Sequence, residues 1–271
     1  MHVGGRQVPV YRCGVTASPE PRDESADARP KLGHGLEYAD DGKNYYEWLA
    51  DSFAPHLRAA TADRAAKRSV VEHGAGTGAL SRLLLERGAG PMVLTEPDPA
   101  LAEMLQATYA GRPDVEVAPG TLEAYLERVG PGAADAIVSS NVLEHVVDDV
   151  ACLRAMWTLL RPGGVLTLYV PARPELYGQF DREVGHQRRY RRGELRQKVQ
   201  AAGFEIGTLK YRNLVGTAGW FLLGRLLNKR GVGKGSVWLY DRLIFPVSRF
   251  VEDLVPPPYG LNLLCLATKR A

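Results

Sequence analysis

The sequence predicts an α/β fold in which a mainly parallel sheet is flanked by helices. Short runs of apolar and β-branched residues alternate with helical stretches, and glycine turns separate them. The chain has 271 residues, enough for one large domain with a substantial insertion. Its 45% apolar and 24% charged residues are typical of a globular protein and exclude a disordered, collagen-like or coiled-coil chain.

The N-terminal part is predicted to be an arm followed by a helix. Residues 1–33 contain several prolines and acids but few large apolar residues after Val15, so we expect a flexible arm. Residues 34–271 form the main domain. A helix should begin near Tyr45, because apolar residues then recur every three or four positions, at Tyr46, Leu49, Phe53 and Leu57.

Five strands and three helices follow in alternation. The strands are expected at Ser69–Glu72, Met92–Thr95, Val115–Ala118, Ala136–Ser139 and Val165–Val170. The helices are expected at Ala79–Arg87, Ala100–Ala110 and Asp149–Leu160. The third helix should end before Pro162, because a proline followed by two glycines cannot continue it.

The alternation loosens after the fifth strand. Residues 172–192 are predicted to be a loop beside the ligand-binding side of the domain, followed by a helix at Glu194–Ala202 and a strand at Phe204–Leu209. Residues 212–259 are predicted to be a helical cap inserted before the last strand, Leu261–Thr268. Two apolar helical segments are expected within it, at Trp220–Leu227 and Trp238–Phe250. They could be core, could cover a hydrophobic acceptor, or could touch a membrane surface.

A glycine-rich turn follows the first strand. Gly74, Gly76 and Gly78 lie between that strand and a helix, where tight turning and close approach of a ligand need residues without a Cβ. The pattern also satisfies a dinucleotide fingerprint, with Glu96 about 20 residues further on. Glu72 argues against that ligand, because a carboxylate beside a pyrophosphate would cost affinity. It would instead favour a cationic ligand.

Four segments give the chain a family resemblance. They are EHGAGTG from Glu72, VLTEPDP from Val93, SSNVLEH from Ser139 and LLRPGGVLTLYVP from Leu159. In this order they resemble the class I S-adenosylmethionine-dependent methyltransferases over Tyr45–Lys269. The resemblance implies a Rossmann-like class I methyltransferase fold with a mainly parallel seven-stranded sheet, an N-terminal helix and a helical C-terminal cap insertion. It also implies S-adenosyl-L-methionine as the cofactor.

The resemblance further implies a set of cofactor-binding residues. They are Tyr45, Glu72, Gly74, Ala75, Gly76, Gly78, Glu96, Pro97, Thr121, Leu122 and Asn141. Glu96 matches the acid that binds the ribose hydroxyls, and Pro97 the residue beside the adenine ring. Thr121 stands where many members carry an aspartate for the adenine amino group; that contact is then absent, made by backbone, or made by Glu123. Asn44 and Tyr45 resemble the N-terminal contact to the methionine carboxylate, although an ordinary amphipathic helix explains them equally well.

The acceptor should lie near the end of the fourth strand, because ligands of such sheets bind at the carboxyl ends of the strands. His145 and His186 are the candidate catalytic residues, and an ordinary histidine pKa near ~6.5 would suit His145 to take a proton from a hydroxyl. Alternatively, Glu144 and His145 only shape their loop. Candidate substrate-binding residues are Glu144, Tyr177, Arg188, Arg189 and Tyr190. The arginines could clamp an anionic acceptor, or form a solvated helix start.

Several partners are not expected. The net charge of +3 is too small to indicate nucleic acid, and no NPP-type tetrapeptide follows the fourth strand. No apolar run is long enough to span a bilayer, and the N-terminus lacks the pattern of a secretory signal. Cys13, Cys152 and Cys265 suggest neither a disulfide framework nor a zinc site, so we expect no metal and a cytoplasmic location. The oligomeric state is not predicted.

The sequence therefore predicts methylation of a small molecule. We expect an oxygen acceptor on a secondary metabolite, a sugar or a lipid-linked intermediate, because Leu176–Tyr190 and the cap resemble a bacterial subgroup of such enzymes. C- or N-methylation, or a cyclisation assisted by the bound donor, would use the same donor site. A non-catalytic partner subunit and an NAD-dependent oxidoreductase are further alternatives.

Overall fold

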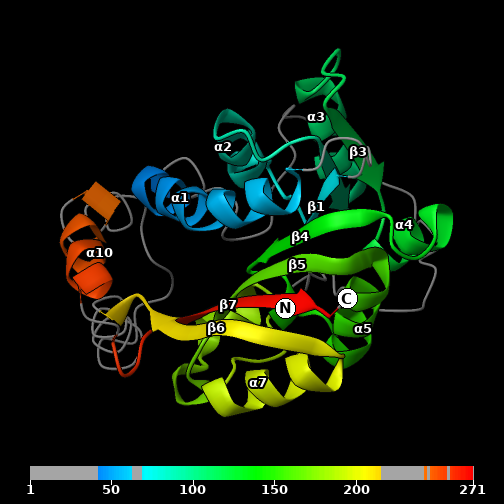
Figure 1. The fold of residues 1–271 in the computed structure, drawn as a ribbon. Coiled ribbons are helices and arrows are strands. Elements are labelled where there is room, and N and C mark those ends of the chain that lie inside the picture. The colour runs from blue at the N-terminus through cyan, green and yellow to red at the C-terminus, as the bar shows by residue number, and fades with distance from the viewer. Residues whose placement is uncertain (1–41, 63–68, 215–240, 243–244, 255–256, 271) are drawn as a thin grey trace, which may run out of the picture.

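A seven-stranded sheet forms the centre of the protein (Figure 1). The computed structural model describes residues 42–62, 69–214, 241–242, 245–254 and 257–270. The strands are β1 (Ser69–His73), β2 (Met92–Glu96), β3 (Val115–Pro119), β4 (Ala134–Ser140), β5 (Leu160–Pro171), β6 (Phe204–Arg212) and β7 (Asn262–Lys269). Their order is β3-β2-β1-β4-β5-β7-β6, and only β7 runs antiparallel to its neighbours. The predicted mainly parallel seven-stranded sheet is confirmed.

Helices cover both faces of the sheet (Figure 1). One face carries α1 (Lys43–Ala60), α2 (Ala79–Glu86) and α3 (Pro99–Thr108), and the other carries α4 (Leu122–Val129), α5 (Asp149–Leu159) and α7 (Arg192–Ala201). Shorter elements are η4 (Leu143–His145), η5 (Pro174–Leu176) and α6 (Gln179–Glu183), and α10 (Phe245–Leu254) lies beside α1. Three layers result.

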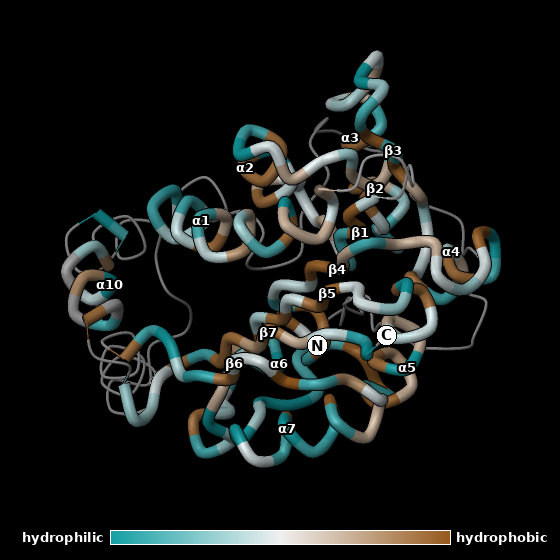
Figure 2. Tube along the Cα trace, in the orientation of Figure 1, coloured by the Kyte–Doolittle hydropathy of each residue, from teal (hydrophilic) through white to brown (hydrophobic). Residues whose placement is uncertain are grey.

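Alternation along the strands divides the core between the two faces. Val70 packs toward the layer of α1 and α2, and the next residue, Val71, toward the layer of α4 and α5. Both are fully buried, as expected for a parallel strand covered on both sides. Figure 2 shows apolar residues along the central strands and polar residues along α7.

The order of the strands fixes where a ligand can bind. The chain moves from β1 outward to β3, then returns to place β4 on the other side of β1. The connections that follow β1 and β4 therefore leave in opposite directions, and the crevice at their carboxyl ends is where such sheets bind ligands. The glycine turn follows β1 and the SSNVLEH segment ends β4, so both lie at this crevice.

Some elements differ from the sequence prediction. The helices α4 and α6 lie where no helix was expected, and α5 ends at Leu159, with β5 beginning at once. The predicted arm at 1–33 and the predicted helix Trp220–Leu227 lie outside the described residues, as does Cys13. Within the predicted segment Trp238–Phe250, the described helix is α10, which begins at Phe245 and continues to Leu254. Among the described helices, none is both long and apolar enough to cross a membrane.

Candidate donor and acceptor site

The loop between β1 and α2 takes a shape that only glycines adopt easily. Gly74, Gly76 and Gly78 have φ angles of +71°, +58° and +78°. A Cβ at Gly74 would lie 2.8 Å from Cγ2 of Val142, and one at Gly78 would lie 2.8 Å from a methyl carbon of Leu105. The three glycines are therefore needed for the packing of the loop itself, before any ligand is considered. This packing brings the loop against the segment that follows β4.

Glu96 ties this loop to the end of β2. Its carboxylate accepts hydrogen bonds from the backbone N–H of Gly76, at 2.8 Å, and from that of Asp98, at 2.9 Å. The backbone N–H groups of Gly74 and Ala75 both donate to the carbonyl of Thr95, at 3.0 Å. The cofactor residues predicted after β1 and β2 are thus brought together.

Glu72 lies beneath the loop and is not an exposed anion. The side chain is buried and accepts a hydrogen bond from the hydroxyl of Ser81 at 2.6 Å. Burial raises the pKa of Glu72 to about 8, and the neighbouring Glu96 adds to the rise. At neutral pH the carboxyl is therefore largely protonated, and it is not the free anion that the sequence led us to expect beside a pyrophosphate. A cationic ligand would lower its pKa, and a pyrophosphate would raise it further.

The same two carboxyl groups test whether S-adenosylmethionine fits. Burial also raises the pKa of Glu96, although the backbone N–H groups of Asp98 and Gly76 oppose the rise. Within the described part of the chain, neither Glu72 nor Glu96 forms an ion pair with a basic side chain. A pair of buried acids beside a glycine loop suits a ligand that carries an ammonium group and a sulfonium. The residues present fit this cofactor.

Tyr45 and Asn141 meet although 96 positions separate them. The amide of Asn141 donates to the hydroxyl of Tyr45 at 3.0 Å, and burial raises the pKa of that hydroxyl. Asn141 has a φ of +53°, which turns the chain sharply after β4. Asp241 accepts hydrogen bonds at 2.9 Å from the backbone N–H groups of Asn44 and Tyr45, and so caps α1. Two predicted cofactor residues thereby form one contact.

The predicted adenine-side residues have structural roles in this form. Thr121 is the N-cap of α4 and accepts a hydrogen bond from the N–H of Ala124 at 3.3 Å. Leu122 is fully buried, whereas Pro97 is partly exposed after β2. Their contact with the cofactor stays a prediction.

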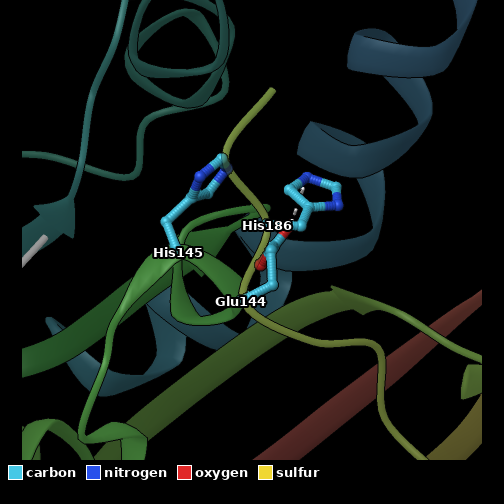
Figure 3. Close-up of side chains that lie close together, drawn as sticks. All are labelled: Glu144, His145 and His186. Atoms are coloured by element: carbon cyan, nitrogen blue, oxygen red, sulfur yellow. Dashed lines mark ion pairs between the residues drawn. The ribbon is translucent and has the colours of Figure 1, made fainter. Parts of the chain in front are cut away.

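The two predicted catalytic histidines lie together with Glu144 (Figure 3). Glu144 and His145 belong to η4, and His186 comes from the loop after α6. A hydrogen bond joins the two segments: the backbone N–H of Gln187 donates to the carbonyl of Glu144 at 2.8 Å. The rings of the two histidines meet edge to face at 4.7 Å between centroids. Nδ1 of His186 lies 2.8 Å from Oδ1 of Asp181, and Nε2 lies 3.8 Å from Oε1 of Glu144.

The electrostatics correct the role predicted for His145. Burial, together with His186, lowers the pKa of His145 to about 3. The ring is therefore neutral at pH 7 but a much weaker base than an ordinary histidine. Burial raises the pKa of Glu144 to about 7, against the opposing effect of His186. A role for His145 as a strong proton acceptor is not supported.

The two arginines of the predicted substrate clamp, Arg188 and Arg189, are paired with carboxylates of the protein. Nε of Arg189 lies 2.7 Å from Oδ1 of Asp181, and both side chains are buried. Arg188 forms an ion pair with Asp149 at 3.0 Å. Tyr190 is fully buried and donates to Oδ2 of Asp149 at 2.9 Å. These side chains hold the loop to η4 and α5, and the binding of an anionic acceptor by Arg188 and Arg189 stays a prediction.

Three further residues are important for the site and were not singled out from the sequence. Asp181 holds both His186 and Arg189, Ser81 holds Glu72, and Asp149 also pairs with Lys198 at 2.6 Å. The predicted substrate residue Tyr177 donates its hydroxyl hydrogen to the carbonyl of His186 at 2.8 Å and so positions the loop. No motif marks these contacts, because each joins segments that meet only in the fold.

Comparison with known proteins gives the same assignment. Residues 45–209 match the family described as "Methyltransferase domain". A probable S-adenosylmethionine-dependent methyltransferase of Mycolicibacterium smegmatis is 30% identical over 54% of this chain and 55% of its own length. A ubiquinone biosynthesis O-methyltransferase of Azotobacter vinelandii is 31% identical over 37% of this chain and 43% of its own length. The chain thus spans about half the length of the curated relatives it matches.

A solved structure shows the same fold. A complex of the methyltransferase CalH with SAH has a TM-score of 0.53 and 18% identity, over 84% of this chain and 58% of its own. The match of the family description covers more than half of the chain, and the glycine loop and Glu96 lie within it. The chain therefore belongs to the methyltransferase domain family of S-adenosylmethionine-dependent methyltransferases.

Proposed function

We propose that this protein transfers a methyl group from S-adenosylmethionine to an oxygen atom of a small molecule. The observation that carries the proposal is the pair of buried acids, Glu72 and Glu96, beside the glycine loop. The bound donor supplies an electrophilic methyl group, so the chain mainly has to hold donor and acceptor in line. A hydroxyl acceptor must also lose its proton.

The polar cluster after β4 supports oxygen as the accepting atom. Glu144, His145 and His186 lie at the carboxyl end of the strand next to β1, in the segment that contacts the glycine loop through Val142. They lie near where the methyl group should emerge, and Glu144, whose pKa burial raises to about 7, can take up a hydroxyl proton. The oxygen acceptor is a secondary metabolite, sugar or lipid-linked intermediate in this proposal. The buried free thiols Cys152 and Cys265 accord with a cytoplasmic location.

Calorimetric titration tests the donor site. We expect S-adenosylhomocysteine to bind at micromolar concentration and NAD not to bind. Glu96→Ala should weaken the binding of S-adenosylhomocysteine by more than about tenfold, that is about 1.4 kcal/mol. Binding of NAD alone would contradict the proposal.

Transfer from a donor with a carbon-13 methyl group tests the reaction. Candidate hydroxylated small molecules are supplied, and the chemical shift of the transferred carbon distinguishes oxygen from nitrogen or carbon as the acceptor atom. An O-methyl resonance supports the proposal. An N- or C-methyl product contradicts the oxygen assignment, and an acceptor that cyclises while the label stays on the donor identifies the donor-assisted cyclase instead.

A further inference from the structure

We propose that Glu144, His145 and His186 bind a divalent transition-metal ion, with one coordination position left for the acceptor. One ligand atom from each residue lies within 4.8 Å of the other two (Figure 3). Two imidazoles and one carboxylate with an open position form a ligand set found in catalytic zinc sites and in non-haem iron sites. The spacing of the three cysteines gave no indication of a metal site, and none was expected from the sequence.

The first independent observation is the carboxylate of Glu144. The side chain is fully buried, yet neither of its oxygens accepts a hydrogen bond from another described residue. Nε2 of His186 lies 3.8 Å from Oε1 of Glu144, which is too long for a hydrogen bond. Buried polar atoms normally have partners, so a carboxylate with no partner among the other described residues indicates a ligand beyond them.

The second observation is the orientation of the histidines. Nδ1 of His186 faces the carboxylate of Asp181 at 2.8 Å, which leaves Nε2 directed toward Glu144. His145 is held by a hydrogen bond to the backbone of Gly185. Histidines that bind metals typically have their second nitrogen held in this way, by a carboxylate or a backbone carbonyl. Asp181 is in turn fixed by Arg189 and by the N–H of Gly178.

Metal binding requires the three ligand atoms to move closer together. Donor atoms at ~2.0–2.1 Å from a tetrahedral zinc ion lie roughly 3.3 Å apart. Glu144 and His186 are 3.8 Å apart and all three ligand atoms lie within 4.8 Å of one another, so side-chain rotation has to bring them closer by up to about 1.5 Å. The metal would take the fourth ligand from solvent or from the acceptor hydroxyl, and a coordinated hydroxyl loses its proton more easily. Metal binding itself does not depend on the proposed methyl transfer, but the role in activating an acceptor does.

Zinc binding to the untagged full chain tests the site. We expect one Zn²⁺ per chain, measured by calorimetry with ZnCl₂ and by elemental analysis after gel filtration. Glu144→Gln and His186→Asn should each weaken the binding by more than about tenfold, since each removes a ligand. Asp181→Asn keeps all three ligands and should weaken it about 10- to 100-fold by freeing the ring of His186. X-ray absorption should show nitrogen and oxygen ligands and no sulfur.

The control is His56→Asn, because His56 is an exposed histidine of α1 remote in sequence from the cluster. It should bind zinc as the unmodified chain does. Circular dichroism and titration with S-adenosylhomocysteine show which variants are folded. Folded protein that binds S-adenosylhomocysteine but no Zn²⁺, or equal zinc affinity in Glu144→Gln, His186→Asn and His56→Asn, would overturn the metal site while the proposed methyl transfer still stands. Zinc binding without S-adenosylhomocysteine binding would support the metal site and contradict the proposed function.

Discussion

The two halves of the crevice are built by different means. At the ends of β1 and β2, backbone conformation and one carboxylate shape the site: three glycines with positive φ, and Glu96 bound to the N–H of Gly76. At the ends of β4 and β5, side chains from distant segments shape it, through Asp149 and Asp181. The first half depends on local sequence, and the second on ion pairs between loops.

This difference sets what each half depends on. In the proposed function the half at the ends of β1 and β2 holds the donor, and its shape is fixed by steric constraints on the backbone. The half at the ends of β4 and β5 is held by ion pairs of the buried carboxylates Asp149 and Asp181 with basic side chains of other segments. A change in the first half should therefore affect donor binding, and a change in the second should mainly affect stability and the position of His186.

Gly74→Ala should give the largest loss of donor affinity. An unchanged affinity would contradict the difference drawn between the two halves of the crevice. The new Cβ would lie 2.8 Å from Val142, at a φ of +71°. We expect the affinity for S-adenosylhomocysteine to fall about 100-fold, or about 2.7 kcal/mol, in calorimetry. Gly111→Ala is the matched control, because Gly111 has a φ of +78° but no neighbouring atom within 4 Å. It should cost about 1 kcal/mol of stability and leave the affinity unchanged.

Asp149→Asn should produce the opposite pattern. Asp149 is buried and pairs with Lys198 and Arg188, while Tyr190 donates to it. Burial opposes ionisation, but these partners hold its pKa below the usual value, so its stabilising effect is present at neutral pH and lost in acid. We expect a loss of about 2 kcal/mol in urea unfolding with donor affinity retained. The control is Asp114→Asn, because Asp114 forms an exposed ion pair with Arg112. This variant should cost less than about 1 kcal/mol of stability. Equal losses in both variants would refute the structural role.

Glu72→Gln should reveal the raised pKa through the pH dependence of stability. Between the ordinary value near 4.5 and the folded value of about 8, the native state keeps a proton that the unfolded state has released. The free energy of unfolding therefore falls as pH rises through this window. The glutamine side chain does not titrate, so the variant should gain on the unmodified chain by an amount of order 1–3 kcal/mol between pH 5 and 8, measured by urea unfolding. A difference independent of pH would show that Glu72 ionises normally.

Most of the fold could be predicted from the sequence because its signals are local. The glycine turn, the strands that alternate with helices and Glu96 all lie in short segments whose periodicity or turn chemistry is visible in the chain. The structure confirms these elements, with shifts of a few residues at their ends. The helix α4 was missed because its eight residues follow β3 after only Gly120 and Thr121, so no extended turn marks its start.

The acceptor half could be predicted only in part, for a physical reason. The arginines suggested a field that faces a ligand, but Asp181 and Asp149 neutralise Arg189 and Arg188 in the fold. These ion pairs form only because the fold places α6 and α5 beside the arginines. The hydrophobic period and the residue spacing of the sequence do not show that placement. The two histidines could be named singly, whereas their meeting with Glu144 required the structure.

Tyr177→Phe should have the smallest effect on stability. It tests whether the loop that carries His186 is positioned by this tyrosine. The variant removes one hydrogen bond, from the hydroxyl of Tyr177 to the carbonyl of His186, and should cost about 1 kcal/mol in urea unfolding. Tyr211→Phe is the control: Tyr211 is also partly buried, and its contact within the described ranges is made by the ring, with the guanidinium of Arg192, which phenylalanine keeps. Donor affinity should be unchanged in both variants, because neither tyrosine contacts the glycine loop.

If Tyr177→Phe also weakens Zn²⁺ binding while Tyr211→Phe does not, the loop positions His186 through its backbone as well as through Asp181. If the two variants unfold at the same urea concentration, the position of His186 depends on Asp181 and not on Tyr177.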